Sequence, residues 1–145
     1  MSSLFSAILA LLSATSKGYI DPPNCENYLG YFGLEQWDAI ELLKEINDNV
    51  HYRCKTEKLA DALFINDTAI FELIAGKLLP NIKLENIAKR IYKQECIPFC
   101  EFSLLMKSAL NKWKVQKITR RKRNLSCSYA KNRRETRHKI GCVFY

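Results

Sequence analysis

The chain has 145 residues, 48% of them hydrophobic, and its 23 Lys and Arg against 15 Asp and Glu give a net charge of +8. This length suits one domain of ordinary size, and the hydrophobic content excludes a disordered chain. The charge is unevenly spread: from Lys107 to Tyr145 there are 13 basic residues and one acid, Glu135, and the rest of the chain holds the remaining 10 basic and 14 acidic residues. So one-sided a block predicts contact with an anionic partner, proteolytic cleavage, or both.

The N-terminus has the pattern of a secretory signal peptide. An apolar run, LFSAILALL at residues 4–12, is followed by small residues that include Ala14 and Ser16. We expect residues 1–16 to be removed and the protein to be secreted, although no Lys or Arg precedes the run. The alternative is a buried N-terminal helix. The run is too short to span a bilayer, and no later segment is long and apolar enough to do so.

All six cysteines follow the expected cleavage site: Cys25, Cys54, Cys96, Cys100, Cys127 and Cys142. An even number in a secreted chain predicts three disulfides, and the 15 possible pairings remain open. A metal site is the weaker interpretation. His51 and His138 are the only histidines, and no second ligand pair has the spacing of a zinc site.

The first half of the chain predicts an irregular segment and then helices. Residues 17–33 are rich in Gly, Pro and Asn, which indicates irregular structure before a domain over residues 34–145. Apolar residues recur every three or four positions over residues 34–50, 59–64 and 70–78, which predicts three helices. Between the last two, Asn66-Asp67-Thr68 fits a helix cap and also an N-glycosylation acceptor.

The second half has two amphipathic segments, at residues 84–92 and 102–113, and we expect both to be helices. Cys96 to Cys100 form a Pro-containing turn between them. Four lysines lie off the apolar stripe of the second helix, at Lys107, Lys112, Lys114 and Lys117. Residues 127–130 predict a short strand or a turn, and residues 140–145 a β-prone end. On these patterns alone the fold is mostly α with disulfides.

Arg120-Arg121-Lys122-Arg123 is the most specific charged feature. Four consecutive cations repel one another and should project into solvent, so a solubilising surface loop is one interpretation. A second is a contact for heparan-type glycans or an anionic membrane. A third is a precursor cleaved after Arg123. Nucleic acid fits the charge but not secretion. A second glycosylation acceptor, Asn124-Leu125-Ser126, follows.

The chain lacks the common catalytic motifs. It has no Gly-rich phosphate loop, no GxSxG and no HExxH. A histidine base would need a nucleophile or a carboxylate beside it, which the sequence does not place. We therefore expect a protein that is not an enzyme and uses no metal or cofactor.

Four segments, in order, resemble the CAP superfamily of cysteine-rich secretory, antigen-5 and pathogenesis-related proteins (the SCP domain). Residues 128–142, SYAKNRRETRHKIGC, resemble its signature at Tyr129, Ala130, Thr136, Lys139, Ile140, Gly141 and Cys142. Residues 85–88, ENIA, look like its Gly-Glu-Asn-Ile segment. Residues 109–113, ALNKW, are similar to its Ala-to-Trp helix, and residues 50–60, VHYRCKTEKLA, to the second helix of secreted members from parasitic nematodes.

The resemblance implies an α+β fold, an α–β–α sandwich whose helices flank a small antiparallel sheet. It also implies a secreted protein that acts by binding, with host or immune modulation and sterol or lipid binding among the family's roles. Ser128 stands where the signature has His, and Asn132-Arg133-Arg134 replaces its apolar stretch. The family's metal cavity therefore does not carry over to this chain.

These observations predict a secreted CAP-like protein, helix-rich and disulfide-bonded, that contacts a protein, glycan or lipid partner through basic residues. The alternative is a disulfide-bonded helical secreted factor that contacts heparan-type glycans or anionic membranes through the same residues. The expected contact surface consists of Arg120, Arg121, Lys122, Arg123, Arg133, Arg134 and Arg137.

Overall fold

The computed structural model describes Cys25, Ile46 and residues 50–96, 101–132, 134 and 136–145. Its centre is a mixed sheet of four strands, in the spatial order β1-β3-β4-β2. Strand β1 runs parallel to β3, and the other two pairs are antiparallel. The strands are β1 (His51–Tyr52), β2 (Ala88–Glu95), β3 (Asn124–Lys131) and β4 (Arg137–Phe144). The fold is therefore α+β, and the mostly helical alternative is wrong for this part of the chain.

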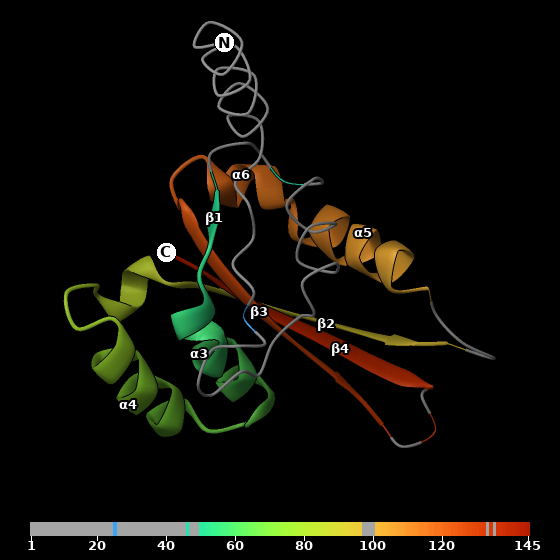
Figure 1. Cartoon of the computed structure of the whole chain (residues 1–145), viewed down its shortest axis with the longest axis horizontal. Helices are drawn as coiled ribbons and strands as arrows, with labels where there is room; N and C mark the ends of the chain where they lie inside the picture. The colour runs from blue at the N-terminus through green and yellow to red at the C-terminus, as the bar shows by residue number, and fades with distance from the viewer. Residues whose placement is uncertain (1–24, 26–45, 47–49, 97–100, 133, 135) are drawn as a thin grey trace, which may run out of the picture.

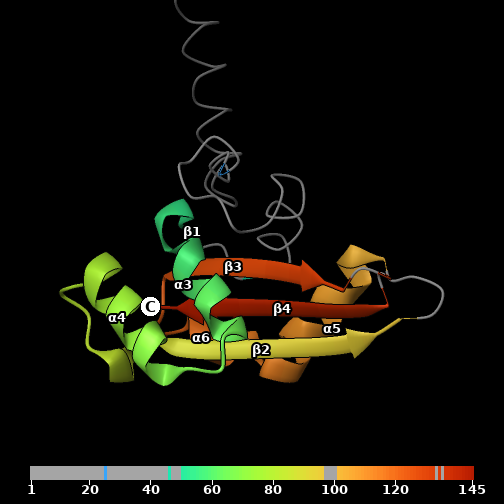
Figure 2. The ribbon, with the colours of Figure 1, turned by 90° about the horizontal axis from the view of Figure 1, so that it is seen from below.

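Helices cover both faces of this sheet. One layer contains α3 and α4, and the other contains α5 and α6 (Figures 1 and 2). The α-helices are α3 (Glu57–Asp61), α4 (Thr68–Leu78), α5 (Phe102–Trp113) and α6 (Val115–Thr119). Short 3-10 turns lead into these elements or between them, namely η2 (Cys54–Thr56), η3 (Ala62–Phe64) and η4 (Leu84–Asn86).

Strand β4 divides the hydrophobic core into two clusters. Ile140, Cys142 and Phe144 pack with α5 and α6, and Val143 packs with α3 and α4. Successive side chains of a strand point to opposite faces, so one short apolar run serves both helix layers. A strand buried on both faces reads as a continuous apolar run, and residues 140–144 have that sequence.

Gly141 lets the α3 layer approach the sheet closely. A Cβ atom added there would lie 3.1 Å from Cε1 of Phe64 and 3.3 Å from the carbonyl oxygen of Ala60. Both distances are shorter than ordinary carbon contacts, because optimal separations are about 3.5–4.0 Å. The missing side chain therefore fixes how closely α3 and η3 lie on β4.

Two sequence-based predictions are confirmed in detail. Helix α4 begins after Asp67, whose carboxylate Oδ1 accepts hydrogen bonds from the amides of Ala69 (3.0 Å) and Ile70 (3.4 Å). It ends at Leu78, just before Pro80. The predicted helix over residues 102–113 is α5 with the same limits. The helix predicted over residues 34–50 lies outside the described residues except for Ile46 and Val50, which are buried on the α5 side.

The helix predicted over residues 84–92 is wrong. Only the 3-10 turn η4 forms there, and Ala88 to Glu95 is an edge strand paired along its length with β4. Its inward-facing residues are Ala88, Arg90, Tyr92 and Gln94, and only two of these four are apolar. The alternation of apolar and polar residues that indicates a strand is therefore weak in the sequence. Ile91 points outward and is 40% exposed. Pairing with β4 overrides the local apolar spacing, as is common for edge strands.

The expected disulfides are present in this part of the chain. Cys25 is bonded to Cys54, and Cys127 is bonded to Cys142. Cys96 is disulfide-bonded as well, and Cys100 lies outside the described residues. The second bridge joins residues that face each other across β3 and β4. It closes a loop of 15 residues, for which chain entropy predicts a stabilisation of about 3 kcal/mol.

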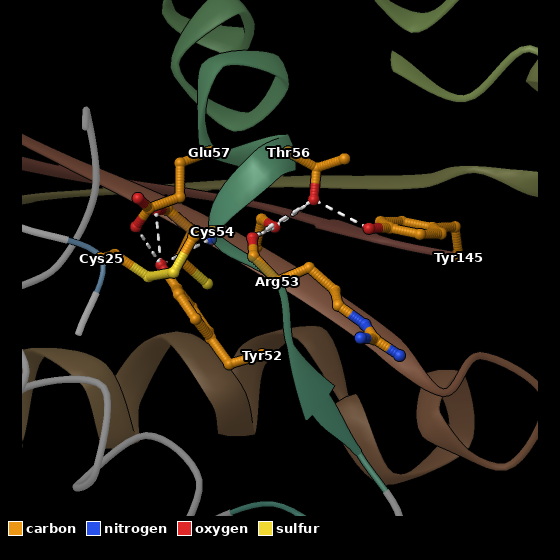
Figure 3. The surroundings of a disulfide bond; sticks show 9 residues. Cys25, Tyr52, Arg53, Cys54, Thr56, Glu57 and Tyr145 are labelled. Atoms are coloured by element: carbon orange, nitrogen blue, oxygen red, sulfur yellow. Dashed lines mark hydrogen bonds between the residues drawn. A yellow bond between two sulfur atoms is a disulfide. The ribbon is translucent and has the colours of Figure 1, made fainter. Parts of the chain in front are cut away.

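A group of hydroxyls joins the first bridge region to the end of the chain (Figure 3). The Thr56 hydroxyl hydrogen-bonds to the Ser126 hydroxyl and, at 2.8 Å, to the phenol of Tyr145. Ser126 in turn donates to the carbonyl oxygen of Arg53. Burial raises the pKa of the Tyr145 phenol, and the Thr56 hydrogen bond and the positive charge of Arg53 oppose this shift.

Replacing Gly141 by Ala should destabilise the fold by about 1–3 kcal/mol, because the new methyl group meets Phe64 and the Ala60 carbonyl. The control is the same change at Gly76, an exposed position of α4 with nothing within 4 Å of the added Cβ. Gly76→Ala should stabilise by about 1 kcal/mol through helix propensity. Urea unfolding measures both, and two changes of equal sign would contradict the close approach at Gly141.

Tyr145 should make the free energy of unfolding fall in alkali. Below about pH 10, folded and unfolded chains both keep the phenol proton, so pH has no effect through this group. Above it the unfolded chain loses the proton first, and stability is lost as the pH rises through the raised folded pKa.

Between about pH 9 and about pH 11, the free energy of unfolding should therefore fall less in Tyr145→Phe than in the parent protein. Urea unfolding at each pH measures this difference. Lysine deprotonation affects both proteins equally. The variant should start about 1 kcal/mol less stable at neutral pH, because it lacks the hydrogen bond to Thr56. Equal pH slopes would contradict a raised pKa of the Tyr145 phenol.

Candidate anion-binding surface

The basic run follows α6 and leads directly into β3. Arg120, Arg121 and Arg123 are exposed, as self-repelling cations should be. Lys122 is half-buried, and its ammonium donates a hydrogen bond to the carbonyl oxygen of Asn86. Three of the four cations thus face solvent, and the fourth fastens the run to the turn before β2.

The remaining predicted contact residues lie at the other end of the β3–β4 hairpin. Arg137 is the first residue of β4, Arg134 lies in the exposed turn before it, and Arg133 lies outside the described residues. The eight residues of β3 separate the two groups by roughly 23 Å at the usual rise per residue. The single surface expected from the sequence is therefore two separate groups, because an extended strand carries neighbours in sequence far apart.

The second group also has an acidic neighbour. Nε of Arg137 lies 3.4 Å from Oε1 of Glu95, across the pairing of β4 with β2. Both side chains are more than two-thirds exposed, so the ion pair adds little stability. It nevertheless lowers the positive potential at this end of the hairpin.

A pocket of about 500 Å³ lies at the corner between α5 and α6. Among the described residues its lining has four cations, two amides, two apolar side chains and no acid: Lys107, Lys114, Lys117, Arg120, Asn111, Gln116, Leu110 and Val115. All four cations are exposed, whereas Leu110 and Val115 are buried in the core cluster below. The four cations follow one another at intervals of seven, three and three residues, and all of them line this pocket.

Lys114 forms the corner. It has φ 52° and ψ 53°, the left-handed conformation, and it both ends α5 and precedes α6. Its amide donates to the carbonyl oxygens of Asn111 and Leu110. A lysine in this conformation costs roughly 1–2 kcal/mol, because its Cβ crowds the following carbonyl. Lys114 thus joins the two helices, and residues on both sides of it line the pocket.

The sequence identified only part of this surface. The sequence predicts that Lys107, Lys114 and Lys117 lie off the apolar stripe of the second amphipathic segment, but these lysines are not among the expected contact residues. The sequence evidence for including them is their spacing, because Lys107, Lys114, Lys117 and Arg120 follow one another at intervals of seven, three and three residues. What the sequence did not reveal is the corner at Lys114, since Gly and Asn, not Lys, are the usual residues in the left-handed conformation.

The groups that could serve catalysis have structural contacts. Tyr52 donates a 2.6 Å hydrogen bond to the buried carboxylate of Glu57 and also contacts the backbone of Cys127 (Figure 3). The ring of His138 is buried, and its Nδ1 hydrogen-bonds to the hydroxyl of Tyr129. Among the residues that the structure describes, no three His, Cys, Asp or Glu side chains form a group that could hold a metal ion.

The peptide bond after Arg123 lies within hydrogen-bonded backbone. The carbonyl of Arg123 accepts from the amide of His51 at 2.7 Å, and Asn124 exchanges two bonds with Tyr145. Cys127 is bonded to Cys142, so a cut here would leave residues 124–145 without a covalent link to the rest through these two cysteines. Cleavage would also separate both central strands of the sheet, β3 and β4, from the preceding chain. A protease would therefore need local unfolding first.

The two glycosylation acceptors differ in accessibility. Asn66 is exposed in the loop before α4. Asn124 is half-buried, with its Oδ1 accepting from Arg53 at 2.8 Å and its Nδ2 donating to the Tyr145 carbonyl at 3.2 Å. The folded structure is thus more compatible with a glycan on Asn66.

Comparisons with protein-family models, with curated proteins and with solved structures found no match for this chain. Within the described ranges, no helix has the length and apolar character needed to cross a membrane.

Proposed function

We propose that this is a secreted protein without enzymatic activity that acts by binding an anionic partner, a glycan of the heparan type, through α5, α6 and Arg120–Arg123. The observation that carries the proposal is the cationic corner between α5 and α6. Residues 102–132 contain no Asp or Glu, and the pocket within them is lined by four cations. Two further exposed cations, Arg121 and Arg123, continue the surface.

We also propose that the scaffold is CAP-like. The ENIA segment leads into β2, the ALNKW segment lies on α5, and the Ile140-Gly141-Cys142 segment lies in β4. Helices flank the sheet on both faces, as the resemblance implies (Figure 2), but the sheet is mixed and not antiparallel throughout, because β1 runs parallel to β3. In such a scaffold the family's roles by binding, host or immune modulation among them, are the ones that apply. Ser128, where the family has His, donates a 3.1 Å hydrogen bond to the carboxylate of Asp61.

An extracellular setting supports the choice of partner. Disulfides such as Cys25–Cys54 and Cys127–Cys142 persist in oxidising compartments. Sulfated glycans are abundant polyanions there, whereas nucleic acid is not. An anionic membrane offers the same charge, but its flat surface does not use a pocket lined by amides.

Immobilised heparin should retain the protein at low ionic strength and release it well below 1 M salt, where the Debye length is about 3 Å. Arg120→Ala/Arg123→Ala should weaken binding about tenfold, because it removes two exposed cations beside the corner. The matched control, Arg134→Ala/Arg137→Ala, removes equal charge from the far end of the hairpin and should change affinity by about threefold or less.

No retention at low salt would contradict the proposed partner. Equal losses in the two double variants would show that net charge, and not the α5–α6 face, governs binding. Preferential binding to vesicles with anionic lipid over heparin would favour a membrane contact instead.

A further inference from the structure

We propose that the pocket at the α5–α6 corner is a binding site for one sulfated sugar unit, and that it selects such a unit over other polyanions. This inference deepens the proposed function and rests on it. The pocket offers three kinds of contact, and a sulfated saccharide uses all of them.

The cations supply the first kind of contact. Lys114, Lys117 and Arg120 line the pocket from the corner and from the side of α6. Like charges three residues apart repel each other, and the Lys114 conformation costs further energy. Gathering these cations around a corner in this conformation therefore costs free energy. A bound sulfate group would offset this repulsion through charge-assisted hydrogen bonds.

The amides and the apolar floor supply the other two kinds of contact. Asn111 and Gln116 line the same pocket, and each amide has donors and an acceptor suited to sugar hydroxyls. Leu110 and Val115 are only 5% and 3% exposed, so they form a small, fixed apolar floor that continues into the core. A sugar ring presents C–H groups on its faces and can pack on such a floor.

The size of the pocket agrees with a saccharide. Its volume of about 500 Å³ lies within the usual range for small-ligand sites, about 300–1,000 Å³. A bare sulfate or phosphate ion would fill only a small part of it and would leave the amides and the floor unused. A polyanion without hydroxyls, such as polyphosphate, would use the cations alone.

The test is calorimetric titration of the oxidised, full-length secreted protein with a heparin-derived tetrasaccharide and, separately, with inorganic polyphosphate. Lys117→Ala/Arg120→Ala removes two pocket cations, and Lys112→Ala/Arg121→Ala removes two exposed cations that do not line the pocket. We expect at least a tenfold loss of tetrasaccharide affinity in the first and about threefold or less in the second.

A second pair of measurements separates sugar recognition from charge. Asn111→Leu/Gln116→Leu keeps the net charge and should weaken the tetrasaccharide several-fold while leaving polyphosphate affinity unchanged. Lys114→Asn removes one cation, and Asn tolerates the left-handed conformation, so the corner should persist. Circular dichroism and urea midpoints of each variant report whether the fold is intact.

Equal losses in the two charge-matched variants, or no effect of the amide substitutions, would overturn the pocket while leaving heparin binding in place. Equal affinities for the tetrasaccharide and for its fully desulfated form would also overturn the proposed site. If the parent protein binds neither heparin nor the tetrasaccharide, the proposed function itself fails.

Discussion

The β3–β4 hairpin is the constraint on which the rest of the structure depends. Its strands are the two central strands of the sheet, and both helix layers pack against them. The Cys127–Cys142 bridge joins its strands at facing positions. Because the hairpin is extended, it also fixes the distance between the basic residues at its two ends. The hairpin length therefore determines which cations can act together.

The two faces of the hairpin are packed differently, and this difference bears on function. Beside the apolar Val143, the face toward α3 carries the small and polar residues Gly141, Ser126 and Ser128, which hold that layer through close approach and hydrogen bonds. The face toward α5 is apolar and anchors Leu105, Met106 and Ala109. With its apolar stripe buried there, α5 must present its lysines to solvent. The core thus holds together a cationic face that would otherwise repel itself.

The sequence predicted those elements whose pattern is set locally. The Asp67 cap, the stop before Pro80 and the stripe of α5 each depend on neighbours within a few residues. Strand β2 was predicted as a helix because its identity depends on pairing with β4, more than 40 residues away. The candidate site was half predicted: Arg120 was included, but the lysines of α5 and α6 join it only through the corner at Lys114. No local rule places a lysine in that conformation.

Nuclear magnetic resonance can show whether the α5–α6 face binds the glycan. Backbone amide shifts of the oxidised protein would be followed while a heparin-derived tetrasaccharide is added. We expect the largest shift changes between Lys107 and Arg123 and none in α4. Changes centred on Arg134 and Arg137, or spread evenly over all exposed cations, would contradict it.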